Sequence, residues 1–271
     1  MRCWVNGRLL KSAEEAAIAI TDHGWTVGDG VFEAVKVVGG RAFALSRHLK
    51  RLQTSAKGLG LAEPDLDEVR RAVAAVVPED LELGRIRITW TAGPSPLGSG
   101  RGSGQSTLAV AAGPMTAQPE STSVVTVPWT RNEHGALAGL KTTSYGENVV
   151  ALARAHEKGA TEAIFGNTAG NLCEGTGSNI FYVVGGELRT PTLASGCLAG
   201  VTRALVLEWI GAREVDEPVG VLEHADEIFL TSTTRDVQAV VRCDDRQIGI
   251  GPVTRAAMQT WAAREAEGID P

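Results

Sequence analysis

The chain lacks most of the motifs that identify metal-binding, disulfide-rich or nucleotide-binding proteins. Its four cysteines are scattered over 271 residues without a CxxC pair, so neither a structural zinc site nor a disulfide framework is expected. The five histidines show no HxxxH or HExxH spacing, which argues against a metal centre. The glycine-rich motifs of Walker-type and Rossmann nucleotide sites are absent, as is the GxSxG motif of α/β-hydrolases.

Charge and hydropathy narrow the class further. The net charge of -6 argues against a nucleic-acid partner, which normally requires clustered Lys and Arg. No apolar run approaches the roughly 20 residues of a membrane span, and the N-terminus does not resemble a signal peptide. We therefore expect a soluble cytoplasmic protein without a membrane partner. Only six of the 26 basic residues are lysines, so lysine-based chemistry has few candidates.

The composition predicts two compact lobes. A hydrophobic content of 43% in a chain of this length can fill one large core or two ordinary ones. Two prolines and a loss of periodicity after Gly113 indicate a linker. We predict a small α/β domain over residues 1–115, a linker over 116–120 and a larger domain over 121–271. The irregular order of helices and strands favours an α/β (α+β) class with a mixed, barrel-like second sheet.

Several local elements follow from turn and periodicity patterns. Asn6-Gly7 and Gly39-Gly40 predict hairpin turns, and Ser46 is expected to cap a helix. In that helix the spacing predicts a core face with Arg51 beside it, and the loop 98–104 is expected to be mobile. The predicted core residues of this helix are Leu49, Leu52 and Ala56. Further helices are predicted at 65–77, 144–158 and from 201, and strands at 85–91, 107–112 and near 163, 180, 188, 228 and 237.

A lone lysine, Lys141, lies between an apolar, strand-like stretch and a predicted helix start. If it is buried there, its ammonium form is disfavoured and the neutral amine that attacks aldehydes becomes accessible near neutral pH. The alternative interpretation is an ordinary capping or surface lysine. The segment makes Lys141 a candidate for Schiff-base chemistry.

Glu174 precedes a glycine-rich turn that leads into a predicted strand. A carboxylate held against a pyridine nitrogen keeps that ring protonated, and the protonated ring is an electron sink. The alternative is a β-turn whose glutamate is merely solvated.

Two later stretches have the character of phosphate-binding sites. Gly200–Arg203 opens a predicted helix, where backbone N–H groups and the helix dipole attract anions. Thr231–Thr234 ends a predicted strand with hydroxyl and amide groups that suit a phosphate. Helix capping and a polar strand end are the ordinary alternatives.

Together these segments resemble the class IV, or fold type IV, pyridoxal-phosphate (PLP) enzymes. That family includes branched-chain aminotransferases, D-amino-acid aminotransferases and 4-amino-4-deoxychorismate lyases. The resemblance covers nearly the whole chain, and the ordered series is more specific than any single motif. It is carried by Gly28–Glu33, His48–Leu52, Leu140–Lys141, Glu174–Gly175, Asn179–Phe181, Thr190–Pro191, Gly200–Arg203 and Thr231–Thr234.

The resemblance implies a fold, a cofactor and an assembly. The fold would be two α/β lobes with PLP between them, in a homodimer whose partner subunit closes the substrate pocket. Lys141 would bind PLP covalently, Glu174 would face the ring nitrogen, and Tyr145 would orient the ring oxygen. The phosphate would be held by Arg51, Val201, Thr202 and Thr233, and Ser178, Asn179 and Ser232 complete the cofactor-binding set.

The reaction depends on the groups that bind the substrate carboxylates. Phe32 replaces a tyrosine that D-amino-acid enzymes often carry, and Ala34 replaces a glycine of branched-chain enzymes. The stretch Arg131-Asn132 ahead of Lys141 is similar to the lyases. Phe32, Arg87 and Arg101 are the predicted substrate-binding residues. The small amino substrate is therefore predicted to be aminodeoxychorismate, with elimination of pyruvate giving 4-aminobenzoate for folate biosynthesis. A class IV aminotransferase is the alternative, and a non-catalytic ligand-binding protein a distant one.

Overall fold

The computed structural model describes residues 1–271, and they divide into two compact units. The change from the first unit to the second at Ala117–Gln118 lies inside the predicted linker. Unit 1 comprises Met1–Ala117, Leu140–Ser144 and Ile269–Pro271, and unit 2 comprises Gln118–Gly139 and Tyr145–Gly268.

Two segments that the prediction placed in domain 121–271 belong to unit 1 instead. Leu140–Ser144 pairs with the first residues of β3 (Gly30–Val38), and Ile269 O accepts a hydrogen bond from Ala44 N. The predicted boundary followed the order of the chain, whereas long-range backbone hydrogen bonds determine where these segments pack.

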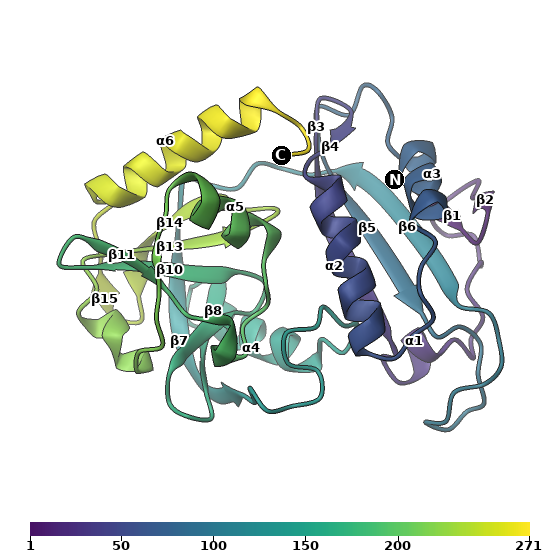
Figure 1. Cartoon of the computed structure of the whole chain (residues 1–271), viewed down its shortest axis with the longest axis horizontal. Coiled ribbons are helices and arrows are strands. Elements are labelled where there is room, and N and C mark those ends of the chain that lie inside the picture. Colours follow the sequence, from purple (N-terminus) through teal and green to yellow (C-terminus); the bar gives the residue numbers. More distant parts are fainter. The chain divides into compact units, whose positions relative to one another are not determined.

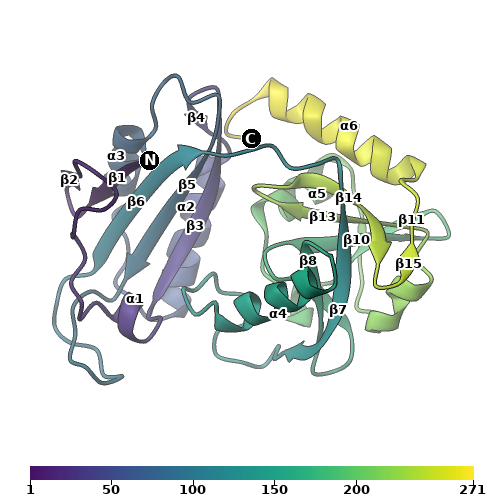
Figure 2. The ribbon, with the colours of Figure 1, turned by 180° about the vertical axis from the view of Figure 1, so that it is seen from behind.

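Unit 1 is a six-stranded antiparallel sheet with α2 and α3 on one face (Figures 1 and 2). The strand order is β2-β1-β6-β5-β3-β4. Both predicted hairpins are present, and their Asn-Gly and Gly-Gly turns adopt the positive φ angles that such turns require. The elements are β1 (Arg2–Val5), β2 (Arg8–Leu9), α1 (His23–Thr26), β3, β4 (Arg41–Ala42), α2 (Leu45–Gly58), α3 (Leu66–Val76), β5 (Leu83–Thr91) and β6 (Thr107–Pro114).

The predicted core face of α2 is confirmed, but its predicted cap is wrong. The helix begins at Leu45 after Ala44, which makes no side-chain cap. Ser46 lies in the first turn, and its N–H and hydroxyl both donate to the carboxylate of Asp270 at 2.9 and 2.6 Å. A distant carboxylate thus does the work of a local N-cap. The fully buried residues of this face are Leu49, Leu52 and Ala56.

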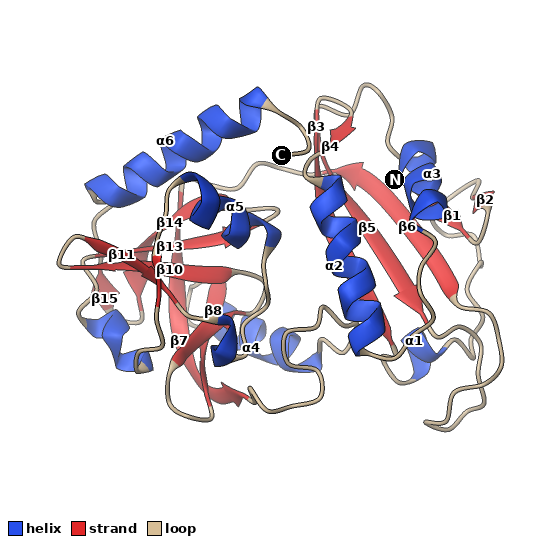
Figure 3. Ribbon diagram, in the orientation of Figure 1, coloured by secondary structure: helices blue, strands red, loops and turns tan.

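Unit 2 is built on a sheet of nine strands, and its mixed parallel and antiparallel pairing agrees with the mixed sheet that was predicted (Figure 3). The strand order is β12-β11-β10-β13-β14-β7-β8-β9, with β15 paired to β14. Residues 176–178 alone join the edge strand β9 to the interior strand β10, so the sheet has to curl to bring the two together. The elements are β7 (Ser121–Arg131), α4 (Gly146–Glu157), β8 (Glu162–Asn167), β9 (Leu172–Gly175), β10 (Asn179–Val184), β11 (Glu187–Thr190), η1 (Leu193–Ser195), α5 (Val201–Trp209), β12 (Arg213–Glu214), η2 (Val219–Glu223), β13 (Glu227–Ser232), β14 (Asp236–Cys243), β15 (Arg246–Gln247) and α6 (Pro252–Glu267).

Each unit has its own hydrophobic core. In unit 1, apolar side chains of β3, β5 and β6 pack against α2 and α3. In unit 2, one core fills the concave side of the curled sheet and a second lies under α4. None of the helices combines the length and hydrophobicity needed to span a bilayer.

Candidate functional site

The backbone of Lys141 is held by two elements of unit 1. Its carbonyl accepts a hydrogen bond from Phe32 N in β3 at 2.9 Å, and its N–H donates to Ser55 Oγ in α2 at 3.2 Å. The next residue, Thr142, forms a bridge with Val31. The segment behaves as a short added strand, so β3 and α2 together set the position of Lys141.

The side chains of Lys141 and Arg87 meet at one aromatic ring. The ring belongs to Phe32, which is 4% exposed. Lys141 Nζ lies 4.5 Å from the ring centroid, and Arg87 Cζ lies 3.4 Å from it. Cations are attracted to the face of an aromatic ring, which explains why both gather there. The structure thus brings together three predicted site residues, in a cluster whose amine and guanidinium suit a ligand with a carbonyl and a negative charge.

Arg51, predicted to bind the cofactor phosphate, forms an ion pair with Glu33. Its Nε and Nη2 donate to the two carboxylate oxygens at 2.8 and 2.7 Å, and His48 Nδ1 lies 2.7 Å from the second oxygen. Burial raises the pKa of Glu33, but the Arg51 charge and the hydrogen bonds from Arg51 and His48 outweigh burial and lower that pKa to about 2. Glu33 and His48 were expected only as parts of the Gly28–Glu33 and His48–Leu52 motifs, without roles of their own. The phosphate contact of Arg51 stays a prediction.

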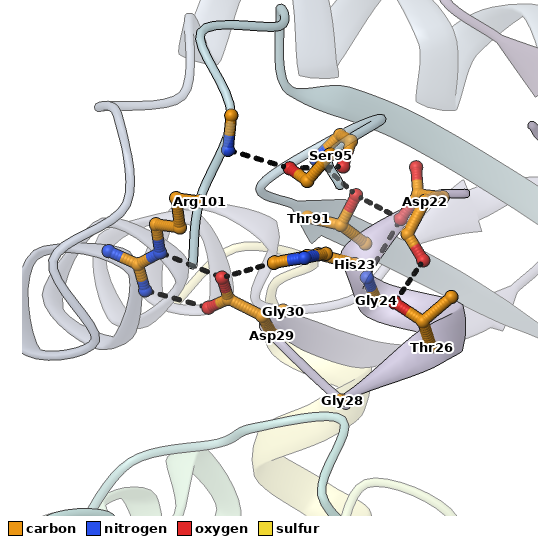
Figure 4. A network of polar contacts seen from close by, with 12 residues as sticks. Asp22, His23, Gly24, Thr26, Gly28, Asp29, Gly30, Thr91, Ser95 and Arg101 are labelled. Carbon is orange, nitrogen blue, oxygen red and sulfur yellow. Dashed lines mark hydrogen bonds and ion pairs between the residues drawn. The ribbon is translucent and has the colours of Figure 1, made fainter. Parts of the chain in front are cut away.

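Arg101 anchors the glycine-rich loop that was expected to be mobile. Its Nε and Nη2 donate to the Asp29 carboxylate, both at 2.7 Å, and it also donates to the carbonyls of Leu59 and Gly60 at 2.8 and 2.6 Å. Figure 4 shows this pair next to the buried His23, whose Nδ1 lies 3.6 Å from Asp29. The hydrogen bonds from Arg101 lower the pKa of Asp29. Any substrate contact of Arg101 would compete with these four hydrogen bonds.

In unit 2, Glu174 lies in β9 opposite Phe165 of β8. The pairing skips Cys173, and such a bulge re-aims the neighbouring side chains. Glu174 Oε2 accepts a hydrogen bond from Leu198 N at 2.9 Å, and Oε1 lies 3.4 Å from Arg131 Nε. With 14% of its side chain exposed, the carboxylate is held in place while it remains accessible to a ligand.

Arg131 is a site residue whose role the sequence analysis missed. Its guanidinium carbon lies 4.1 Å from the centroid of the Phe165 ring, and Nη2 donates to Asn148 Oδ1 at 2.5 Å. Asn148 in turn donates to Thr176 O at 2.8 Å, in the turn between β9 and β10. An arginine at a strand end carries no specific sequence signal, because only the register of three strands shows which carboxylate it reaches.

A second missed residue, Glu162, fixes the turn between β9 and β10. This buried carboxylate accepts hydrogen bonds from Thr176 N and from the hydroxyl of Ser178, both at 2.9 Å. Ser178, predicted to bind the cofactor, therefore donates its hydroxyl hydrogen to Glu162. Asn179 Nδ2 donates a hydrogen bond to Leu198 O at 2.8 Å, and the N–H of the same Leu198 donates to the Glu174 carboxylate.

The N-terminus of α5 provides an anion-binding feature. Gly200 is the N-cap and makes no side-chain cap, so the first N–H groups of the helix have no intrahelical partner. A Cβ at Gly200 would lie 2.0 Å from Asn179 Oδ1, so the close approach requires glycine. Thr231 of β13 pairs with Asn179, and its buried Oγ1 has no hydrogen-bond partner.

The remaining predicted residues of unit 2 lie at element ends. Ser232 ends β13 and accepts a hydrogen bond from Arg235 N at 3.2 Å, Thr233 follows it, and Tyr145 is the N-cap of α4. The free N–H groups at the start of α5 and the buried hydroxyl of Thr231 are donors that suit a phosphate group. The anchored carboxylate of Glu174 suits a protonated pyridine nitrogen. The donor set of unit 2 therefore fits PLP.

The family model for class IV aminotransferases matches residues 30–243. The chain therefore belongs to the class IV aminotransferase family. Members of this family are PLP-dependent enzymes, and the recognition, fold class and cofactor predicted from the sequence are confirmed.

Curated relatives and solved structures resemble the chain over nearly its full length. A Methanocaldococcus jannaschii protein named "Putative branched-chain-amino-acid aminotransferase" is 32% identical over 94% of this chain and 93% of its own. The D-alanine aminotransferase of Bacillus licheniformis is 29% identical over 94% of both chains. A hypothetical aminotransferase from Mycobacterium tuberculosis in a PLP-bound form has a TM-score of 0.85 at 26% identity, covering 97% of this chain and 98% of its own. A Legionella pneumophila structure described as "Putative 4-amino-4-deoxychorismate lyase" has a TM-score of 0.86 at 24% identity, covering 94% and 97%.

Proposed function

We propose that the protein is an aminotransferase that moves an amino group between a small amino acid and a 2-oxo acid, with PLP bound to Lys141. The observation that carries the proposal is the fixed position of Lys141, whose amine shares the Phe32 ring with Arg87. A lysine held by backbone pairing suits covalent binding of an aldehyde, and the neighbouring guanidinium suits an anionic substrate. The names of the M. jannaschii and B. licheniformis relatives support this reaction class.

The chain's own residues would divide the work as follows. Bound PLP supplies an electron sink for the charge left when the substrate Cα loses a proton. Lys141 Nζ would accept that proton, Glu174 would keep the ring nitrogen protonated, and Tyr145 would orient the ring oxygen. The other residues proposed to contact the cofactor are Arg51, Ser178, Asn179, Val201, Thr202, Ser232 and Thr233.

The lyase reaction that the sequence favoured is the second candidate. A role in folate biosynthesis would apply only if the protein catalyses this reaction. The lyase reaction also begins with loss of a Cα proton. Arg87 is the cation that would favour this reaction, because it could bind a carboxylate of the substrate. A chorismate-derived dicarboxylate needs more than one such cation, and Arg101, the other candidate, is held by Asp29 and two carbonyls. The L. pneumophila structure, at 24% identity, bears on the fold alone. We therefore rank the aminotransferase first.

We further propose that the protein is a homodimer. Several large apolar side chains of unit 1 are exposed, four of them within residues 18–27, and exposed apolar side chains of this kind are often covered by a second copy. They are Ile18 (52% exposed), Ile20 (76%), Trp25 (73%), Val27 (47%) and Leu97 (84%). Sedimentation of the purified protein would test this, with a monomer at micromolar concentration as the contrary result.

Borohydride trapping tests the proposed function. Wild-type protein incubated with PLP and then reduced should carry one pyridoxyl label, and peptide mapping should place it at Lys141. The Lys141→Ala variant should carry no label, whereas Lys50→Ala, at an exposed lysine of α2, should be labelled like wild type. Labelling of the Lys141→Ala variant at the wild-type level would contradict the assignment.

A substrate panel then separates the two reactions. L- and D-amino acids with 2-oxoglutarate, and aminodeoxychorismate alone, should be offered to the same preparation. The proposal expects an oxo acid and glutamate from at least one amino acid, and no 4-aminobenzoate. Release of 4-aminobenzoate without amino transfer would replace the aminotransferase by the lyase.

A further inference from the structure

We infer that Arg131 is a positioning residue, which orients the Glu174 carboxylate and so keeps the proton on the ring nitrogen of PLP. The inference rests on the proposed role of Glu174 opposite that nitrogen. It extends the site by a residue of β7, two strands away from Glu174, which lies outside the predicted cofactor-binding set.

The register of three neighbouring strands creates the arrangement. Arg131 ends β7, β7 pairs with β8, and Phe165 of β8 lies opposite Glu174 of β9. The guanidinium of Arg131 therefore crosses the Phe165 ring, with 4.1 Å between its carbon and the ring centroid, and reaches Glu174 Oε1 at 3.4 Å. Two strand pairings and one aromatic ring thus define where the positive charge lies.

The far end of the guanidinium is also fixed. Asn148 Oδ1 accepts a hydrogen bond from Arg131 Nη2 at 2.5 Å, and Asn148 itself is held by Thr176 O. Glu147 lies 3.5 Å from Nη1, but its side chain is 79% exposed and contributes little. Because the Arg131 side chain is only 16% exposed, solvent screens its interaction with Glu174 weakly.

The charge of Arg131 determines which partner holds the proton. A proton shared by a pyridine nitrogen and a carboxyl group stays on the ring only while the carboxylate is the weaker base. A guanidinium beside the carboxylate favours its ionised form, so Arg131 stabilises the pair of charged groups over the neutral pair. Removal of Arg131 would let the proton move to Glu174 and would weaken the electron sink.

The titration of Glu174 in the cofactor-free full-length protein is the direct test. Glutamate labelled with 13C at Cδ allows the carboxyl to be followed by NMR, and the Glu174→Gln variant assigns its resonance. In Arg131→Gln the titration midpoint should move up. In Arg131→Lys, which keeps a charge, it should stay close to wild type. Arg154→Gln removes a surface arginine of α4 that pairs only with exposed Glu157 at 3.0 Å, and it should change nothing.

Cofactor binding and turnover provide the second readout. Loss of a partly buried ion pair is expected to correspond to about a tenfold change, so in Arg131→Gln the PLP dissociation constant should rise and kcat should fall by about that factor, with KM less affected. An unchanged Glu174 midpoint in folded Arg131→Gln would overturn the inference. If that variant does not fold, Arg131→Lys decides: its retained charge should keep the PLP dissociation constant and kcat close to wild type, and a loss of about tenfold in both at an unchanged Glu174 midpoint would overturn the role of the charge. Failure of the proposed function is distinct, because the wild-type protein would then either bind no PLP or release 4-aminobenzoate without amino transfer, while the cofactor-free titration still reports on Arg131 and Glu174.

Discussion

Each unit contains an arginine–carboxylate pair, Arg51–Glu33 in unit 1 and Arg131–Glu174 in unit 2. The two carboxylates differ in how deeply they are buried and in how closely the arginine binds them. In unit 1 the Glu33 side chain is 0% exposed and accepts two hydrogen bonds from Arg51 and one from His48. In unit 2 the Glu174 side chain is 14% exposed and lies 3.4 Å from Arg131. A buried, saturated pair contributes mainly to the fold, because breaking it leaves an uncompensated charge. A looser, partly exposed pair leaves the carboxylate accessible to a ligand, so we expect its loss to be felt mainly in catalysis.

Replacement of Glu33 should give the largest effect on stability. Glu33→Gln keeps the shape of the side chain but leaves the Arg51 cation without its buried partner, which costs about 3–5 kcal/mol. Urea unfolding of the cofactor-free protein would measure the loss. A change below about 1 kcal/mol, the range of a surface pair, would show that the contrast between the two pairs is wrong.

The matching change in unit 2 should act on the reaction instead. Glu174→Gln removes the charge proposed to keep the ring nitrogen protonated, so kcat should fall about 100-fold, the scale of a lost electrostatic contact at a reacting centre. The free energy of unfolding should change by no more than about 1 kcal/mol. Steady-state kinetics and urea unfolding of the same preparations check both halves. A stability loss as large as that of Glu33→Gln would make Glu174 a structural residue.

Acid should destabilise the protein through the Glu33 pair. The pKa of Glu33 is lowered from 4.5 to about 2, so the unfolded chain binds the proton first and stability falls as the pH drops from 4.5 toward 2. Burial lowers the pKa of His48 below 6.5 despite the opposing bond to Glu33, and this adds loss of stability in the same direction from pH 6.5 downward. Urea midpoints measured against pH should show the decline. In Glu33→Gln the part below pH 4.5 should be weaker; an identical slope would assign the acid sensitivity to other groups.

Much of the fold was predictable because it follows from local patterns. Asn6-Gly7 and Gly39-Gly40 have the conformational freedom that a tight turn requires, and the helical spacing of Leu49 and Leu52 identified a core face. The helix Pro252–Glu267 was missed, since its apolar residues do not gather on one face. The Ser46 cap was wrong because its partner, Asp270, lies at the other end of the chain.

The residues of the candidate site also fall into two groups: those that a local sequence pattern marks and those that only the strand arrangement reveals. Lys141 and Glu174 became candidates from the residues around them in the sequence, and their roles were predicted from the resemblance to the family. The roles of Arg131 and Glu162 were not predicted, because they depend on which strands are neighbours: Arg131 reaches Glu174 across β8, and Glu162 of β8 reaches Ser178 in the turn that follows β9. Side chains that position other side chains leave no local pattern when the contact crosses a sheet.

A third pair, Arg101 and Asp29, extends the comparison to an exposed position and should give the smallest effect. The Arg101 side chain is 40% exposed, so solvent screening reduces the value of its two bonds to Asp29 to about 1 kcal/mol or less. Arg101→Ala should therefore barely move the urea midpoint. It also removes two hydrogen bonds to the carbonyls of Leu59 and Gly60, which are the bonds that tie the 98–104 loop to the end of α2. Limited proteolysis should consequently cut that loop faster in Arg101→Ala than in wild type, while an equal rate would show that the loop is held without Arg101. A loss of stability as large as that of Glu33→Gln would mean that burial is not what separates the three pairs.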